Sequence, residues 1–206
     1  MLIDSHCHLD FPDFAEELDD VVARAEAAGL GRMVTICTRV RKFPQVLAVA
    51  ERFENVFCSV GTHPHNAHEE LDVTTQEIID LSKHPKVVAI GEAGLDYFYQ
   101  KDHAASQAEG LRNHIAAARE TQLPLVIHSR DADDDMARIL SDEYANGAYS
   151  CVMHCYSSGA ELAKTAVDLG FYLSMSGIAA FPKSQEVRDI FAKAPLDRIL
   201  VETDAP

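Results

Sequence analysis

The segment "LPLVIH" (residues 123–128) is a short, almost continuously apolar run that follows a helical pattern over residues 103–122. An apolar run of this length without polar alternation indicates a strand that is buried on both faces, as in a parallel sheet. In the preceding segment Leu111, Ile115 and Ala118 recur at helical spacing, so one face of the helix is apolar. A helix followed by a buried strand predicts one unit of a helix-covered parallel sheet.

The same alternation extends along the chain in both directions. Further apolar runs typical of buried strands occur at residues 1–4, 32–38, 56–62, 87–92, 149–154, 171–177 and 198–204. Helical patterns occur at residues 14–29, 43–53, 74–83, 103–122, 131–145, 160–169 and 184–194. Eight strands alternating with helices predict an α/β fold of the closed (β/α)₈ TIM barrel type. A doubly wound open sheet is the alternative, because the same alternation also produces that fold.

The pattern also predicts how the chain is divided. No linker or low-complexity segment interrupts it, so residues 1–206 are expected to form a single barrel domain. The sequence ends at Pro206, two residues after the last expected strand, which indicates a C-terminally truncated barrel lacking its C-terminal helix. Without that helix, we expect an exposed apolar seam beside the first and last strands.

Composition excludes several classes of protein. With 47% hydrophobic residues in 206, the chain can bury a substantial core. The net charge of −15 lacks the basic footprint of a protein that coats nucleic acid, so any contact with nucleic acid has to be local. Five cysteines, an odd number, indicate reduced thiols and a cytoplasmic location. We expect no membrane association, because no apolar stretch reaches the length needed to span a bilayer.

Residues suited to metal binding stand where the expected strands end. In "IDSHCHLD" (residues 3–10) two histidines are two residues apart, a spacing that puts both imidazoles on one side of a strand. In a (β/α)₈ barrel the carboxyl ends of all strands meet at one mouth. Six candidate ligands exceed the four of a tetrahedral zinc ion, so we expect two divalent ions with a bridging glutamate. The candidates are His6, His8, Glu92, His128, His154 and Asp204.

Other side chains at the same mouth are candidates for binding substrate. His63 and His65 follow the third strand and Arg130 follows the fifth, and such groups suit a phosphate. Structural alternatives exist for two of them: His63, which precedes a proline, orders a loop, or Arg130 pairs with Asp131 or Asp133.

Three more side chains near the mouth have open roles. Glu202, two residues before Asp204, either orients a ligand or is an ordinary polar residue of the barrel interior. Tyr97 and Phe98 either stack on a nucleobase or pack a loop.

Several segments resemble the motifs of the TatD family of metal-dependent deoxyribonucleases, part of the amidohydrolase superfamily. They agree in order and spacing: "DSHCHLD" (4–10), "VGTHPH" (60–65), "AIGEAGLDYF" (89–98), "LVIHSRDA" (125–132), "MHCYSSG" (153–159) and "LVETDAP" (200–206). The resemblance implies that His6, His8 and Asp204 hold one metal ion. It implies that His128 and His154 hold the second ion, with Glu92 as the bridge.

The resemblance also implies an activity. Members hydrolyse DNA phosphodiester bonds through a metal-activated water, reported as 3′–5′ exonuclease activity, so single-stranded DNA or a DNA 3′ end is the expected substrate. Asp204 and Glu92 are then the expected catalytic residues, with Asp204 accepting the proton of the water. The ligand types accommodate Zn, Mg or Mn.

Two other functions are compatible with the same residues. A small-molecule amidohydrolase or phosphoesterase would use the same metal site, although many such relatives have a modified lysine where this chain has Glu92. A catalytically weak metal-binding or interaction protein is the third possibility. Nothing in the sequence indicates the oligomeric state.

Overall fold

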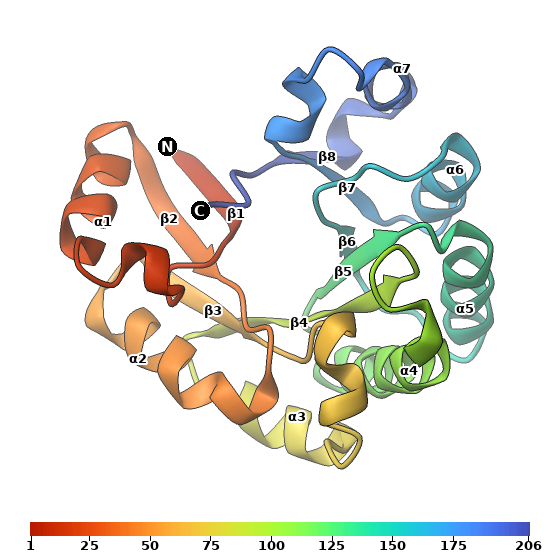
Figure 1. The fold of residues 1–206 in the computed structure, drawn as a ribbon, viewed down its shortest axis with the longest axis horizontal. Coiled ribbons are helices and arrows are strands. Elements are labelled where there is room, and N and C mark those ends of the chain that lie inside the picture. Colours follow the sequence, from red (N-terminus) through yellow and green to blue (C-terminus); the bar gives the residue numbers. More distant parts are fainter.

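The computed structural model describes residues 1–206 as one parallel sheet with its strands in sequence order, β1 to β8. The strands are β1 (Leu2–Cys7), β2 (Leu30–Thr35), β3 (Val56–Val60), β4 (Val87–Asp96), β5 (Leu125–Arg130), β6 (Cys151–Met153), β7 (Tyr172–Met175) and β8 (Ile199–Val201). The helices are α1 (Leu18–Ala27), α2 (Phe43–Arg52), α3 (Thr75–Ser82), α4 (Ala104–Thr121), α5 (Asp133–Ala145), α6 (Ala160–Asp168) and α7 (Gln185–Lys193). They lie outside the ring of strands (Figure 1). The expected (β/α)₈ barrel is therefore confirmed, and the doubly wound alternative is wrong.

Apolar residues hold the strands and helices together as the sequence pattern predicts. Leu125 and Ile127 of β5 are completely buried, and Leu111, Ile115 and Ala118 of α4 pack into the same core. Burying one such leucine or isoleucine side chain contributes about 1.5–3 kcal/mol. No helix combines the length and the apolarity needed to cross a membrane.

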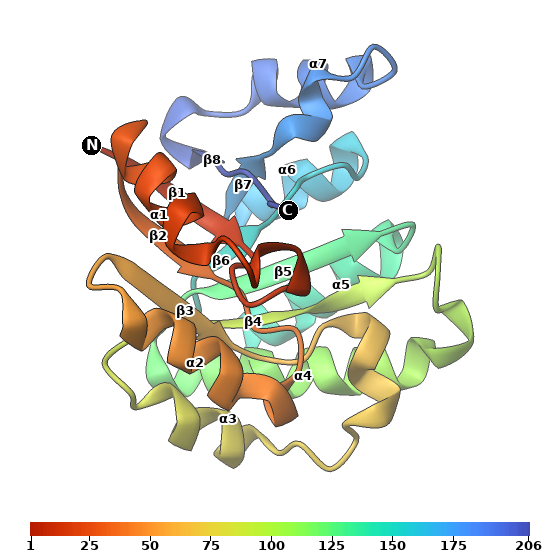
Figure 2. The same ribbon diagram turned by 60° about the vertical axis from the view of Figure 1, so that its left-hand side comes forward.

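The first and last strands of the ring are joined by backbone hydrogen bonds only near their carboxyl ends, between the end of β1 and the segment after β8. The backbone N–H of His8 donates to the Ala205 carbonyl at 2.7 Å. Elsewhere along these two strands, Leu2 and Ile3 of β1 and Val201 of β8 are 59%, 48% and 60% exposed. In Figure 1 no helix lies outside the ring between α7 and α1, and Figure 2 shows β1 and β8 as neighbours from a second side. The expected apolar seam is thus present.

β4 is longer than the sequence indicates, and this places two acidic residues differently. The expected strand ends at Glu92, whereas β4 continues to Asp96. Its pairing with β5 shifts register between Ile90 and Ala93, and beyond the shift Gly94 lies opposite His128. A Cβ at Gly94 would lie 1.9 Å from the His128 carbonyl oxygen, so only glycine permits this close approach. Glu92 therefore lies within the strand, and Asp96 occupies its carboxyl end.

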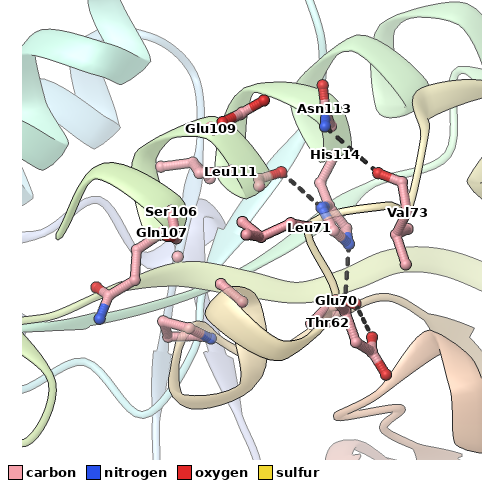
Figure 3. A pocket seen from close by; sticks show the side chains of 14 residues that line it. Thr62, Glu70, Leu71, Val73, Ser106, Gln107, Glu109, Leu111, Asn113 and His114 are labelled. Carbon is pink, nitrogen blue, oxygen red and sulfur yellow. Dashed lines mark hydrogen bonds between the residues drawn. The ribbon is translucent and has the colours of Figure 1, made fainter. Parts of the chain in front are cut away.

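α4 anchors the end of β3 through a buried histidine. A small cavity of about 20 Å³ lies between α4 and the 3₁₀ helix η3 (Pro64–Glu69). Beside it, the backbone N–H of Thr62 donates to His114 Nε2 at 3.0 Å, and His114 Nδ1 donates to the Gly110 carbonyl at 2.7 Å (Figure 3). Because burial disfavours the charged imidazole, the pKa of His114 is lowered to about 4. His114 is thus a neutral structural residue that fixes the residue before His63.

Protonation of His114 should make the fold less stable in acid. The unfolded chain binds this proton near pH 6.5 and the folded chain only near pH 4, so the contribution is complete above pH 6.5 and falls as the pH decreases. Between a pH of about 7.5 and about 5 we expect a loss of about 2 kcal/mol from this residue. His114→Gln should remove that part of the pH dependence in urea unfolding, whereas His84→Gln should keep it. An unchanged slope in His114→Gln would contradict the assignment.

Candidate metal centre

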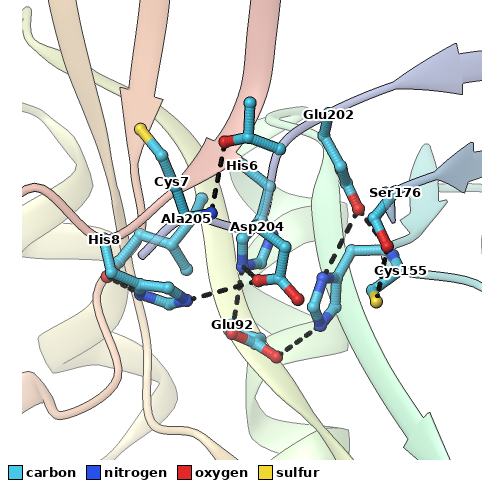
Figure 4. A network of polar contacts seen from close by, with 12 residues as sticks. His6, Cys7, His8, Glu92, Cys155, Ser176, Glu202, Asp204 and Ala205 are labelled. Carbon is cyan, nitrogen blue, oxygen red and sulfur yellow. Dashed lines mark hydrogen bonds and ion pairs between the residues drawn. The ribbon is translucent and has the colours of Figure 1, made fainter. Parts of the chain in front are cut away.

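The carboxyl ends of the strands bring the expected metal ligands together at one mouth. Glu92 of β4 is the residue that the other members share, and Figure 4 shows its carboxylate joined by dashed lines to the imidazole of His6 and to a second imidazole. Its side chain is 2% exposed, so the carboxylate is enclosed by the residues around it. The converging set is His6, His8, Glu92, His128, His154 and Asp204.

One group of ligand atoms surrounds the end of β1. Glu92 Oε2 lies 3.4 Å from His6 Nε2. Asp204 Oδ1 lies 3.6 Å from His6 Nε2 and 3.7 Å from His8 Nε2. Ligand atoms that share one tetrahedral ion at bond lengths of about 2.0–2.2 Å lie about 3.3–3.6 Å apart. These spacings therefore suit a single bound cation.

A second group faces the other oxygen of the same carboxylate. Glu92 Oε1 lies 2.7 Å from His154 Nε2 and 3.3 Å from His128 Nδ1. His63 Nε2 lies 3.5 Å from the same oxygen. The sequence predicts His63 only as a substrate-binding residue, and the structure adds that it borders the candidate ligands.

Buried polar atoms in this centre lack hydrogen-bond partners. They are both ring nitrogens of His6, both ring nitrogens of His154, and Glu92 Oε1, whose contacts with each other do not have hydrogen-bond geometry. Each buried polar group left unsatisfied costs about 1–3 kcal/mol. A bound cation would accept a free lone pair from one ring nitrogen of each imidazole and from Glu92 Oε1, so the residues present fit bound metal ions.

Opposing effects determine the protonation of the centre. Burial alone raises the pKa of Glu92, but His154, His63 and His128 lower it well below the usual range. Burial alone lowers the pKa of His154, but Glu92 and Glu202 raise it well above its usual value. Asp204 likewise has a lowered pKa, because contacts with His8 and the neighbouring imidazoles outweigh burial. The carboxylates are therefore ionised and available to a cation.

The carboxylate of Asp96 accepts hydrogen bonds from two of the histidines, although Asp96 is not among the site residues that the sequence predicts. Its Oδ2 accepts from His65 Nε2 at 2.7 Å and from His128 Nε2 at 3.1 Å. Since the proton of His128 is on Nε2, its Nδ1 is free to face Glu92. The sequence signal for it is the aspartate in "GLDYF", which stands four residues beyond the expected strand end at Glu92. Because β4 continues four residues beyond Glu92, Asp96 lies at the mouth together with the candidate ligands.

Glu202 has contacts that suit an orienting residue. Its Oε1 accepts from the backbone N–H of Cys155 at 2.5 Å and lies 3.6 Å from His154 Nδ1. Ser5 Oγ donates to the other carboxylate oxygen at 3.2 Å. Glu202 thus fixes the loop after β6 by a hydrogen bond and lies close to the ring of His154.

The remaining candidates at the mouth differ in how they are held. His65 borders a cavity of about 370 Å³ that His63 also lines. Arg130 is exposed and forms no ion pair with Asp131 or Asp133, so that structural alternative is wrong. The hydroxyl of Tyr97 donates to Asp135 at 2.8 Å and is engaged in the protein.

Comparisons with known proteins agree with this site. Residues 3–206 match the family model described as "TatD related DNase". The chain is 36% identical over 206 residues to the "Uncharacterized metal-dependent hydrolase YabD" of Bacillus subtilis, covering 100% of this chain and 80% of that one. It is 38% identical over 208 residues to YcfH of Escherichia coli, with the same description, covering 100% and 77%.

A solved structure is similar along the whole chain. The crystal structure of YjjV, a TatD homologue from Escherichia coli, has a TM-score of 0.91 at 33% identity, covering 100% of this chain and 79% of that one. Fold, site and relatives together define a metal-dependent hydrolase. The chain belongs to the TatD family.

Asp96 should control how tightly metal is bound. Asp96→Asn weakens the charged hydrogen bond to His128 and permits the other ring tautomer, and such changes beside ligands cost about 10–100-fold in metal affinity. Titration calorimetry with Zn²⁺ or Mn²⁺ measures this loss. Asp102→Asn, an exposed residue nearby, is the control and should bind like the parent. Equal affinity in both variants would contradict an orienting role for Asp96.

Proposed function

We propose that this protein is a deoxyribonuclease that removes nucleotides from DNA 3′ ends, using two divalent ions. The observation that carries the proposal is the position of Glu92, whose two carboxylate oxygens face separate groups of imidazoles. Oε2 faces His6, and Oε1 faces His128 and His154. A carboxylate that spans two ligand groups suits a bridge between two ions.

The ligand set indicates how the two ions would be held. His6, His8 and Asp204 would hold one, and His128 and His154 the other, with Glu92 between them. When bound, two such ions lower the pKa of a water molecule and stabilise the charge that develops on a phosphate. The nitrogen and oxygen ligands accept zinc, manganese or magnesium.

The chain's own residues supply the remaining steps. The side chain of Asp204 is 30% exposed at the mouth, which suits it to accept the proton of the attacking water. His63 Nδ1 accepts from the backbone N–H of His65 at 3.1 Å, so the proton of the neutral ring is on Nε2 and can be donated to a phosphate oxygen. His65 and Arg130 are further candidates for holding the phosphate.

DNA is the substrate that the family description favours. A net charge of −15 opposes polyanion binding over the surface as a whole, but bound divalent ions provide positive charge where the scissile phosphate lies. A small phosphodiester or amide is the competing substrate, because the same ligands serve many hydrolytic reactions.

Degradation of end-labelled single-stranded DNA tests the proposal. With Mn²⁺, Mg²⁺ or Zn²⁺ added, we expect a 3′ label to be released at once and a 5′ label to remain on progressively shorter strands. Glu92→Gln and His128→Ala should lose at least about 100-fold in rate, since each removes a group that stabilises the transition state. Glu109→Gln, an exposed residue on α4, should retain activity.

The competing results are distinct. Intact DNA together with hydrolysis of a small phosphodiester or a cyclic amide would replace the nuclease by a small-molecule hydrolase. Loss of the 5′ label first would reverse the polarity.

The number of ions is open to direct measurement. After equilibration with Zn²⁺ and removal of free metal, elemental analysis should find two ions per chain. Glu92→Gln should reduce this to one or none, because an amide binds metal more weakly than a carboxylate and bridges poorly. One tightly bound ion in the parent chain would contradict the two-ion proposal.

A further inference from the structure

Two aromatic side chains are unusually exposed on the loop that follows β4. Phe98 is 55% exposed and Tyr99 is 58% exposed. Their rings pack edge to face, with centroids 4.6 Å apart. The guanidinium carbon of Arg130 lies 4.2 Å from the ring centroid of Phe98 and 4.8 Å from that of Tyr99. We call these three residues the aromatic platform.

Arg130 is free to interact with a ligand. Its guanidinium forms neither an ion pair nor a hydrogen bond with another side chain. Among the residues that line the two large cavities at the mouth, of about 370 and 810 Å³, it is the only lysine or arginine. The rest of the larger cavity includes Asp131, Asp133, Asp134 and Asp135. A polyanion would therefore be repelled by these four aspartates and attracted to Arg130 of the platform.

The platform is separated from the metal centre by one histidine. The ring of Tyr99 packs edge to face against His65, with centroids 5.3 Å apart. His65 Nε2 donates a hydrogen bond to Asp96, which also accepts one from His128. A strand whose phosphate lies between Glu92 and His65 would bring its neighbouring base to the platform.

We propose that the aromatic platform stacks on the nucleobase next to the scissile phosphate. This inference rests on the proposed function and adds the site that receives the base. Exposed aromatic rings can stack on any nucleobase, because every base has a π-face. A guanidinium can stack on such rings and at the same time donate hydrogen bonds to phosphate oxygens. The chemistry recognised is thus an unpaired nucleotide of any sequence, as at a frayed or single-stranded 3′ end.

Binding without catalysis isolates the stacking contact. Two fluorescent oligonucleotides with cleavage-resistant phosphorothioate linkages at their 3′ ends are compared by anisotropy in the presence of Mn²⁺, one complete and one with abasic residues at its 3′ end. We expect the complete strand to bind about tenfold more tightly. Phe98→Leu and Tyr99→Leu, which keep apolar bulk at exposed positions, should lose this preference.

A matched control lies at the opposite end of the barrel. There Arg198 covers Tyr172, at 5.1 Å from the ring centroid, at the start of β7. Tyr172→Leu should keep the preference of the parent chain. If the platform variants also keep it, the rings do not stack on the base and the proposal is wrong.

Cleavage of the same two strands separates this inference from the proposed function. A parent chain that cleaves the complete strand about tenfold faster, with the preference lost in the platform variants, supports the platform. Equal cleavage of both strands by the parent overturns the platform and leaves the nuclease standing. Cleavage of neither strand, in the presence of metal, overturns both.

Discussion

The burial of the Glu92 carboxylate is the constraint on which the rest of this structure depends. An ionised carboxylate with 2% exposure is very costly unless it is paired or coordinates metal. The pairing groups have to come from several strands, because no single strand can surround a carboxylate. A ring of parallel strands provides them, since β1, β5 and β6 all have their carboxyl ends at the mouth of the barrel, where Glu92 meets their histidines.

β4 connects that constraint to the rest of the mouth. Glu92 lies within the strand, Asp96 ends it, and Phe98 and Tyr99 follow directly. Its close approach to β5 at Gly94 places Asp96 beside His128, so one strand carries the candidate bridge and the carboxylate that orients a candidate ligand. The same strand leads into the exposed rings. Changes at Gly94 would therefore affect the whole mouth.

The charge distribution at the mouth complements this arrangement. The chain carries a net charge of −15, and the α5 end of the mouth is acidic. Attraction for an anion is therefore confined to the centre, where cations fit between the ligands, and to Arg130. For the proposed nuclease, confined attraction of this kind would favour a single bound strand end over coating of a duplex.

The sequence by itself determined the barrel and the convergence of six candidate ligands. Apolar runs and helical periodicity locate strands and helices to within a few residues, and a (β/α)₈ barrel always gathers the residues after its strands at one mouth. The tertiary structure decided what depends on contacts between distant segments. The register shift that lengthens β4, the pairing of Asp96 with His65 and His128, and the stacking of Arg130 on Phe98 rather than pairing with Asp131 are of this kind. Each follows from the packing of one loop or strand against another, which no local pattern of residues records.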